Sequence, residues 1–86
     1  MYRIVYEKRI RKDLDKIPNA DVEKILERIR NLSFDPMPFG VKKLSGKFGL
    51  YRARQGDYRI VYTVNHKDKS VRITLVSHRK ESYRDL

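Results

Sequence analysis

The feature that most constrains the fold is a change in the spacing of apolar residues along the chain. In the first half, five aliphatic side chains recur at helical spacing, namely Val22, Ile25, Leu26, Ile29 and Leu32, which predicts an amphipathic helix. From Phe48 onward, apolar and polar residues alternate, which is typical of strands. We expect three strands at residues 50–54, 58–64 and 71–77, separated by turns at Gln55-Gly56 and at residues 65–70.

The segment before the long helix holds two shorter elements. Residues 2–6 alternate in a Tyr/Ile/Val-rich run and predict a strand, while Ile10, Leu14 and Ile17 predict a short helix that stops at Pro18. Asn19 is expected to cap the long helix, which ends at Pro36, Pro38 and Gly40. The order β-α-α-β-β-β predicts a single α+β domain over residues 1–86, an antiparallel meander sheet with a helical hairpin packed on one face.

The charge of the chain is unevenly distributed. Of its 86 residues, 21 are Lys or Arg and 11 are Asp or Glu, and residues 40–80 hold eleven bases against only Asp57 and Asp68. A clustered excess of this size is typical of proteins that bind nucleic acid, and RNA is the polyanion we favour. Solubility or an acidic protein partner would explain the same excess. As RNA- or ribosome-binding residues we single out Lys42, Lys43 and Lys47 in the loop at residues 41–47, and Arg72.

Several classes of protein are not expected. The chain has no cysteine, so neither a disulfide framework nor a thiolate metal site is possible, and two distant histidines make a catalytic metal improbable. It has no apolar run of membrane-spanning length and no segment resembling a signal peptide. We therefore expect a cytoplasmic protein with no cofactor, no metal and no membrane partner.

The predicted strands gather arginines on one face of the sheet. If the first turn is Gln55-Gly56, Arg52 pairs with Arg59. If the turn is Gly56-Asp57 instead, Arg54 pairs with Arg59. Both registers place Arg52, Arg54 and Arg59 on the face away from the helices, and an even second loop adds Arg72, Thr74, Val76 and His78 to it. Like charges directly opposed destabilise a sheet, whereas guanidinium groups suit a phosphate. A hydrated basic face with no ligand is the alternative.

Two side chains near the end of the chain could move protons. His78 follows the last strand, and histidine is the most natural general acid or base at neutral pH. Tyr83 would serve if nearby cations lowered its pKa. The alternatives are an ordinary strand-end histidine and a tyrosine that simply covers the core.

Two runs of residues resemble a known family. The run from Leu50 to Tyr62 (LYRARQGDYRIVY), followed by Val76-Ser77-His78-Arg79 and Tyr83, resembles the RelE/ParE superfamily of toxins from prokaryotic toxin–antitoxin pairs. The loop at residues 37–46 (MPFGVKKLSG) fits the same family more loosely. The resemblance covers essentially the whole chain and implies a single RelE-like toxin domain over residues 1–86.

In its RelE branch, the resemblance implies a ribosome-dependent endoribonuclease that cuts messenger RNA without a metal, by attack of the 2′-hydroxyl on the adjacent phosphate. The catalytic positions fall on Arg52, Arg54, Arg59, Arg79 and Tyr83. The first two are lysines in the best-known members, so the proton-transfer roles are open and His78 is a possible substitute. The expected partners are a cognate antitoxin, the ribosome and messenger RNA. The alternatives are a ParE-like inhibitor of DNA gyrase that is not an enzyme, and a plain RNA-binding module.

Overall fold

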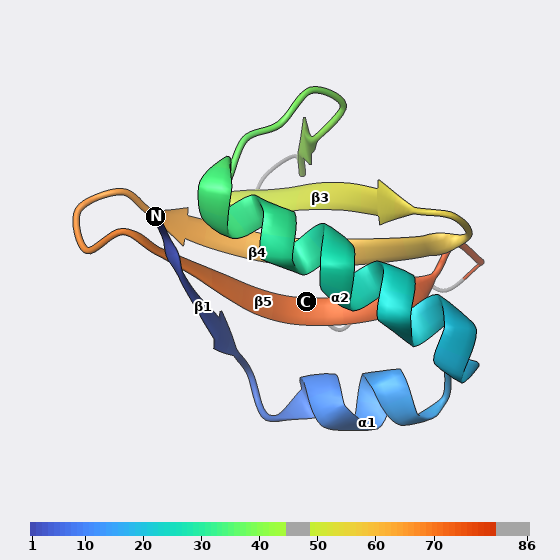
Figure 1. The fold of residues 1–86 in the computed structure, drawn as a ribbon. Coiled ribbons are helices and arrows are strands. Elements are labelled where there is room, and N and C mark those ends of the chain that lie inside the picture. The colour runs from blue at the N-terminus through green and yellow to red at the C-terminus, as the bar shows by residue number, and fades with distance from the viewer. Residues whose placement is uncertain (45–48, 81–86) are drawn as a thin grey trace.

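The computed structural model describes residues 1–44 and 49–80 and has the predicted α+β architecture of two helices and one sheet (Figure 1). The elements in chain order are β1 (Arg3–Tyr6), α1 (Arg9–Asp15), α2 (Asn19–Phe34), β2 (Lys42–Lys43), β3 (Leu50–Gln55), β4 (Tyr58–Asn65) and β5 (Ser70–His78). The predicted order of elements is confirmed, with β2 added where only a loop was expected.

The five strands lie in the order β1-β5-β4-β3-β2. β2 to β5 pair in an antiparallel manner, as predicted, but β1 lies parallel to β5, so the expectation of a purely antiparallel sheet is wrong for β1. The two helices that connect β1 to the later strands are long enough for β1 to lie either parallel or antiparallel to its neighbour. Alternation within residues 2–6 indicates a strand but says nothing about its neighbour.

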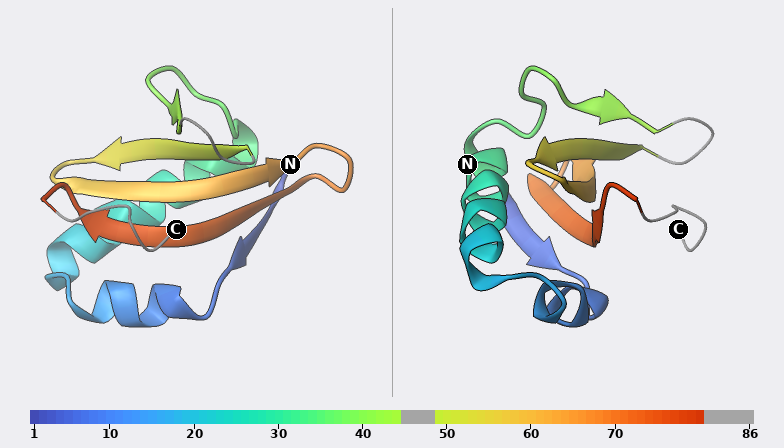
Figure 2. Two further views of the ribbon diagram at one scale, coloured as in Figure 1. Left: turned by 180° about the vertical axis from the view of Figure 1, so that it is seen from behind. Right: turned by 90° about the vertical axis from the view of Figure 1, so that its right-hand side faces the viewer.

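The core lies between the helices and one face of the sheet. From α2, the side chains of Ile25, Ile29 and Leu32 are fully buried, which confirms the predicted apolar stripe. They pack against the sheet side chains Ala53, Ile60, Tyr62, Val71, Ile73 and Val76. In the right-hand view of Figure 2, α2 lies along one face of the sheet, whereas α1 lies below the strands, next to β5. No helix within residues 1–44 and 49–80 is long and apolar enough to cross a membrane.

The start of α2 differs slightly from the prediction. Asn19 is the first residue of the helix, and Pro18 occupies the N-cap position without a side-chain cap. Proline suits a helix start because its fixed φ and missing N–H cost nothing there. Asp21 lies in the first turn, as expected, where its negative charge complements the helix dipole.

An extra residue interrupts the pairing of β4 with β5. Tyr62 pairs with Ile73 but Val61 pairs with Leu75, so Thr74 forms a β-bulge. The Thr74 Oγ1 hydroxyl donates a hydrogen bond to the Val61 carbonyl at 3.1 Å. The Val76 N–H donates to Asp13 Oδ2 of α1, also at 3.1 Å.

The bulge reverses the alternation of β5 beyond Thr74. Leu75 pairs with Val61 and Ser77 with Arg59, so Leu75 and Ser77 share the face of the arginines. Val76 packs in the core, and His78, opposite Tyr58, lies on the helix side. The predicted placement of Val76 and His78 on the arginine face is therefore wrong, because a strict period of two cannot include an unpaired residue.

Candidate active site on the arginine-bearing face of the sheet

Four strands bring cations together on the face away from the helices. We call this the arginine face and define it as Lys42, Arg52, Arg54, Arg59 and Arg72. Arg54 lies directly opposite Arg59, and Arg52 lies between Val61 on β4 and Lys42 on β2. Arg72 pairs with Thr63 further along β5. The prediction that Arg52, Arg54, Arg59 and Arg72 share one face is confirmed.

The turn between β3 and β4 fixes this register. The two residues outside the strands are Gly56 and Asp57, and Gly56 has φ 59°, a left-handed conformation that glycine adopts without strain. Of the two registers considered from the sequence, the one that pairs Arg54 with Arg59 is therefore observed.

The cations of this face repel one another. Arg54 opposes Arg59, and Lys42 opposes Arg52, and each like-charged pair weakens the sheet by a few tenths of a kcal/mol, up to about 1 kcal/mol. Within residues 1–44 and 49–80, neither Arg52 nor Arg54 forms an ion pair with a carboxylate. Arg54 and Lys42 are exposed and Arg52 is half-buried, so this potential reaches the solvent. An anion bound here would relieve the repulsion.

Arg79 lies beside the same end of the sheet. Its backbone N–H donates to the Asp57 carbonyl at 2.7 Å, and its Nε lies 3.6 Å from Asp57 Oδ1. Both side chains are more than half exposed, at 53% and 62%, so their ion pair is weak. The backbone contact fixes the position of Arg79 next to the row formed by Arg54 and Arg59, while its guanidinium can still turn toward a ligand.

Four other predicted site residues are not brought into this group. Tyr83 and Lys47 lie outside the described residues, so their roles stay predictions. Lys43 pairs with Tyr51, whose side chain packs on the core side, and therefore faces away from the arginines. His78 is separated from them by the sheet: its ring packs edge-on against Tyr58, with centroids 5.4 Å apart, and its Nδ1 accepts a hydrogen bond from the Lys80 N–H at 3.2 Å.

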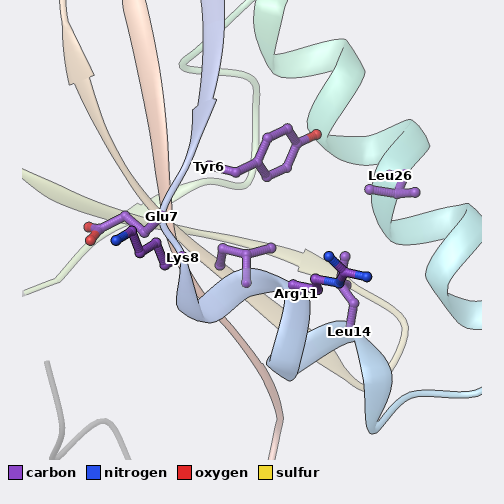
Figure 3. Close-up of a pocket in the computed structure, with 7 residues that line it drawn as sticks. Tyr6, Glu7, Lys8, Arg11, Leu14 and Leu26 are labelled. Carbon is purple, nitrogen blue, oxygen red and sulfur yellow. The ribbon is translucent and has the colours of Figure 1, made fainter.

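The hollows formed by the described residues include two beside α1. The larger, of about 580 Å³, lies between the end of β1, α1 and α2, and Figure 3 shows Tyr6, Leu14 and Leu26 around it. Burial raises the pKa of Tyr6, although the charge of Arg30 opposes this shift. The smaller is a polar cavity of about 260 Å³ next to His78. Within the described residues, no three His, Asp or Glu side chains are grouped so that they could hold a metal ion.

Sequence reasoning missed two parts of this arrangement. Lys42 was expected only in a basic loop, yet it pairs with Arg52 and extends the arginine face. Arg9, Asp13 and Lys16 line the polar cavity. Their spacing of four and three residues places them on one side of the short helix, but the strands that complete the cavity are more than 40 residues away in sequence.

Comparisons with known proteins show the family to which the chain belongs. A family described as the ParE toxin of the type II toxin–antitoxin system parDE matches residues 4–83. The chain belongs to the RelE/ParE superfamily of toxins. Putative toxin RelE1 of Methanocaldococcus jannaschii is 32% identical, in an alignment that covers 98% of this chain and 97% of that protein. Toxin RelG of Mycobacterium tuberculosis is 30% identical, with 96% and 97% covered.

The solved structures place the toxin in the RelE branch of the superfamily. The archaeal RelE–RelB complex from Pyrococcus horikoshii OT3 is similar with a TM-score of 0.80 and 40% identity, covering 94% of this chain and 98% of that one. The isolated RelE toxin of E. coli also has a TM-score of 0.80, but at 21% identity it shows the fold alone. The protein is thus the toxin of a toxin–antitoxin pair, and its partner is a cognate antitoxin.

Proposed function

We propose that this toxin is a ribosome-dependent endoribonuclease that cleaves messenger RNA at the arginine face. The observation that carries the proposal is the common face of Arg52, Arg54 and Arg59, with Arg79 beside it. These four residues occupy the catalytic positions implied by the RelE resemblance. They also provide guanidinium groups, which bind phosphate oxygens through paired hydrogen bonds.

The main contribution that the arginine face can make to this reaction is to stabilise negative charge on the phosphate. The 2′-oxygen of one nucleotide attacks the adjacent phosphorus, the bond from phosphorus to the 5′-oxygen breaks, and the products are a 2′,3′-cyclic phosphate and a 5′-hydroxyl. Negative charge grows on the non-bridging oxygens in the transition state, where Arg52, Arg54 and Arg59 would hold it. Arg79 would stabilise the leaving 5′-oxygen while that oxygen takes up a proton from water.

Proton removal from the 2′-hydroxyl requires another group. Arginine stays protonated at any physiological pH and so cannot act as the base. We assign this step to Tyr83, as the resemblance implies. The placement of His78 on the opposite side of the sheet argues against its use as a substitute base for a phosphate held by Arg54.

Primer extension on messenger RNA after brief expression of the toxin tests the proposal. We expect in-frame cuts within codons at the ribosomal A site, with 2′,3′-cyclic phosphate ends. In single-turnover cleavage of ribosome-bound messenger RNA, Arg54→Ala should be slower by about a hundredfold or more. The matched control is Arg30→Ala on α2, because Arg30 is 67% exposed and lies away from this face.

Each alternative function has its own outcome in the same experiments. DNA breaks that depend on gyrase, without messenger RNA cuts, would establish the ParE-like activity instead. Ribosome or RNA binding without any cleavage would leave only an RNA-binding module. A parental rate in Arg54→Ala would show that the arginine face is not the active site.

A further inference from the structure

The polar cavity lies behind the end of the sheet that carries the arginines. Its walls come from the short helix, the segment after it and the last two strands: Arg9, Asp13, Lys16, Ile17, Tyr58, Val76, Ser77 and His78. In Figure 1 this is the end of the sheet where α1 gives way to α2 and where β5 ends. Neighbouring residues alternate between the two faces here. Arg59 lies in front and Tyr58 behind it on β4, and Ser77 lies in front and His78 behind it on β5.

The charge of the cavity favours an anion. Among the described residues that line it, Asp13 alone carries a carboxylate. This group is 10% exposed, accepts a hydrogen bond from the Val76 N–H at 3.1 Å, and lies 3.4 Å from the Arg9 Nε. These contacts engage Asp13 within the cavity wall. Arg9 retains its terminal guanidinium nitrogens, and Lys16 adds an exposed ammonium group. The described side chains that face a ligand therefore carry a net positive charge.

An aromatic pair forms the opposite wall. The rings of Tyr58 and His78 meet at 90° with centroids 5.4 Å apart. Because the His78 Nδ1 accepts a hydrogen bond from the Lys80 N–H, the neutral imidazole carries its hydrogen on Nε2 and is a donor there. Burial raises the pKa of Tyr58, and the Asp21 and Asp57 carboxylates raise it further, so its hydroxyl stays protonated as a donor at neutral pH.

We propose that this cavity is a subsite for one nucleotide of single-stranded RNA, with the base against Tyr58 and His78 and the phosphate on Lys16 and Arg9. Single-stranded RNA is typically bound by aromatic rings that stack on bases, combined with cations that track the backbone. A strand that lies on Arg54 and Arg59 reaches the cavity by passing round the end of the sheet beside Arg79. The inference rests on the proposed nuclease function and adds a second contact for its substrate.

Lys16→Ala and His78→Ala test the subsite against a matched control, Lys12→Ala. Lys12 and Lys16 are both exposed, and their replacement removes the same charge, but Lys12 does not line the cavity. Base stacking is typically worth enough to change affinity or rate about tenfold. We expect the RNA affinity or the cleavage rate of each cavity variant to fall about tenfold, while its melting temperature stays near that of Lys12→Ala.

Two readouts distinguish the source of the RNA. If the cavity holds messenger RNA, the cavity variants should cleave at a lower single-turnover rate at saturating toxin and bind ribosomes with unchanged affinity. If it holds ribosomal RNA, ribosome affinity falls and cleavage by bound toxin is kept. Either result supports an RNA subsite. The Lys16 side chain is exposed, so Lys16→Ala should fold normally. This variant therefore tests the subsite even if His78→Ala does not fold.

The proposal is overturned if Lys16→Ala matches Lys12→Ala in both readouts. A third measurement separates this failure from failure of the nuclease proposal. Fluorescence titration with a short single-stranded oligoribonucleotide requires no cleavage, so it reports on the cavity even if the parent protein proves inactive. Equal affinities of Lys16→Ala and Lys12→Ala in that titration would likewise refute the subsite.

Discussion

Replacement of Asp13 by alanine tests how the irregular strand β5 is held in place. The Asp13 carboxylate is 10% exposed and accepts the Val76 N–H at 3.1 Å. Val76 itself is 3% exposed, so water cannot readily replace the lost acceptor. The variant would therefore leave a buried N–H without a partner, next to the bulge that decides which side chains of β5 face the arginines.

The expected loss of stability follows from these contacts. A hydrogen bond to a charged acceptor contributes about 1.5–3 kcal/mol, and the i,i+4 pair with Arg9 adds a few tenths more at most, because Arg9 is 42% exposed. In a domain of this length, 1 kcal/mol shifts the melting temperature by about 4–8 °C. Asp13→Ala should thus melt about 10 °C or more below the parent. Asp13→Asn keeps an acceptor oxygen and should lose about half as much free energy of unfolding.

Urea denaturation and amide hydrogen exchange would measure both effects. We expect the Val76 amide to lose protection in Asp13→Ala by more than the global loss of stability requires. Asp15→Ala, which removes an exposed carboxylate from the same helix, is the control. The reasoning is refuted if Asp13→Ala is as stable as Asp15→Ala, or if Asn and Ala at position 13 are equally destabilising.

Three further changes test other parts of the molecule. Ile29→Asp should unfold the domain because it buries a charge in a fully enclosed site, whereas Glu27→Ala should not, and circular dichroism would compare them. Burial raises the pKa of Tyr62, so its hydroxyl ionises more easily in the unfolded chain than in the folded one. The free energy of unfolding should therefore fall as pH rises above about 10. A Tyr62→Phe variant that loses as much stability at alkaline pH would contradict this. Lys42→Ala, on the arginine face, should lower the salt dependence of ribosome binding more than Lys43→Ala does on the other face, and equal slopes would show that the face does not matter.

The elements that the sequence predicts best are those decided by local side-chain patterns. The stripe that includes Ile25 and Ile29 forms α2 and is buried, because a helix needs only its own periodicity to choose the face it packs. Arg52 and Arg54 share a face with Arg59, because both even-length turns preserve the parity of the hairpin. Neither conclusion required knowledge of a distant contact.

The parts that could not be predicted depend on contacts between distant segments. The alternation of polar and apolar residues breaks after Thr74, where Leu75 and Val76 are both apolar, but two adjacent apolar residues do not show where an extra residue enters the pairing. The bulge is held by the Val61 carbonyl and by Asp13, which lies 63 residues from Val76 in the sequence. The parallel pairing of β1 with β5 depends in the same way on how both helices pack, and no pattern within residues 2–6 encodes it.

The two faces of the sheet divide the requirements of stability and binding. The helix face supplies most of the apolar burial, with Ile60, Tyr62 and Ile73 fully enclosed, although Val61 and Leu75 on the arginine face are also buried. Full burial of one such side chain contributes about 1.5–3 kcal/mol, which exceeds the repulsion of an opposed cation pair. The fold can therefore tolerate Arg54 against Arg59 on the other face. A phosphate bound across Arg54 and Arg59 would reduce the repulsion between their guanidinium groups, and this is the physical basis for placing the proposed chemistry there.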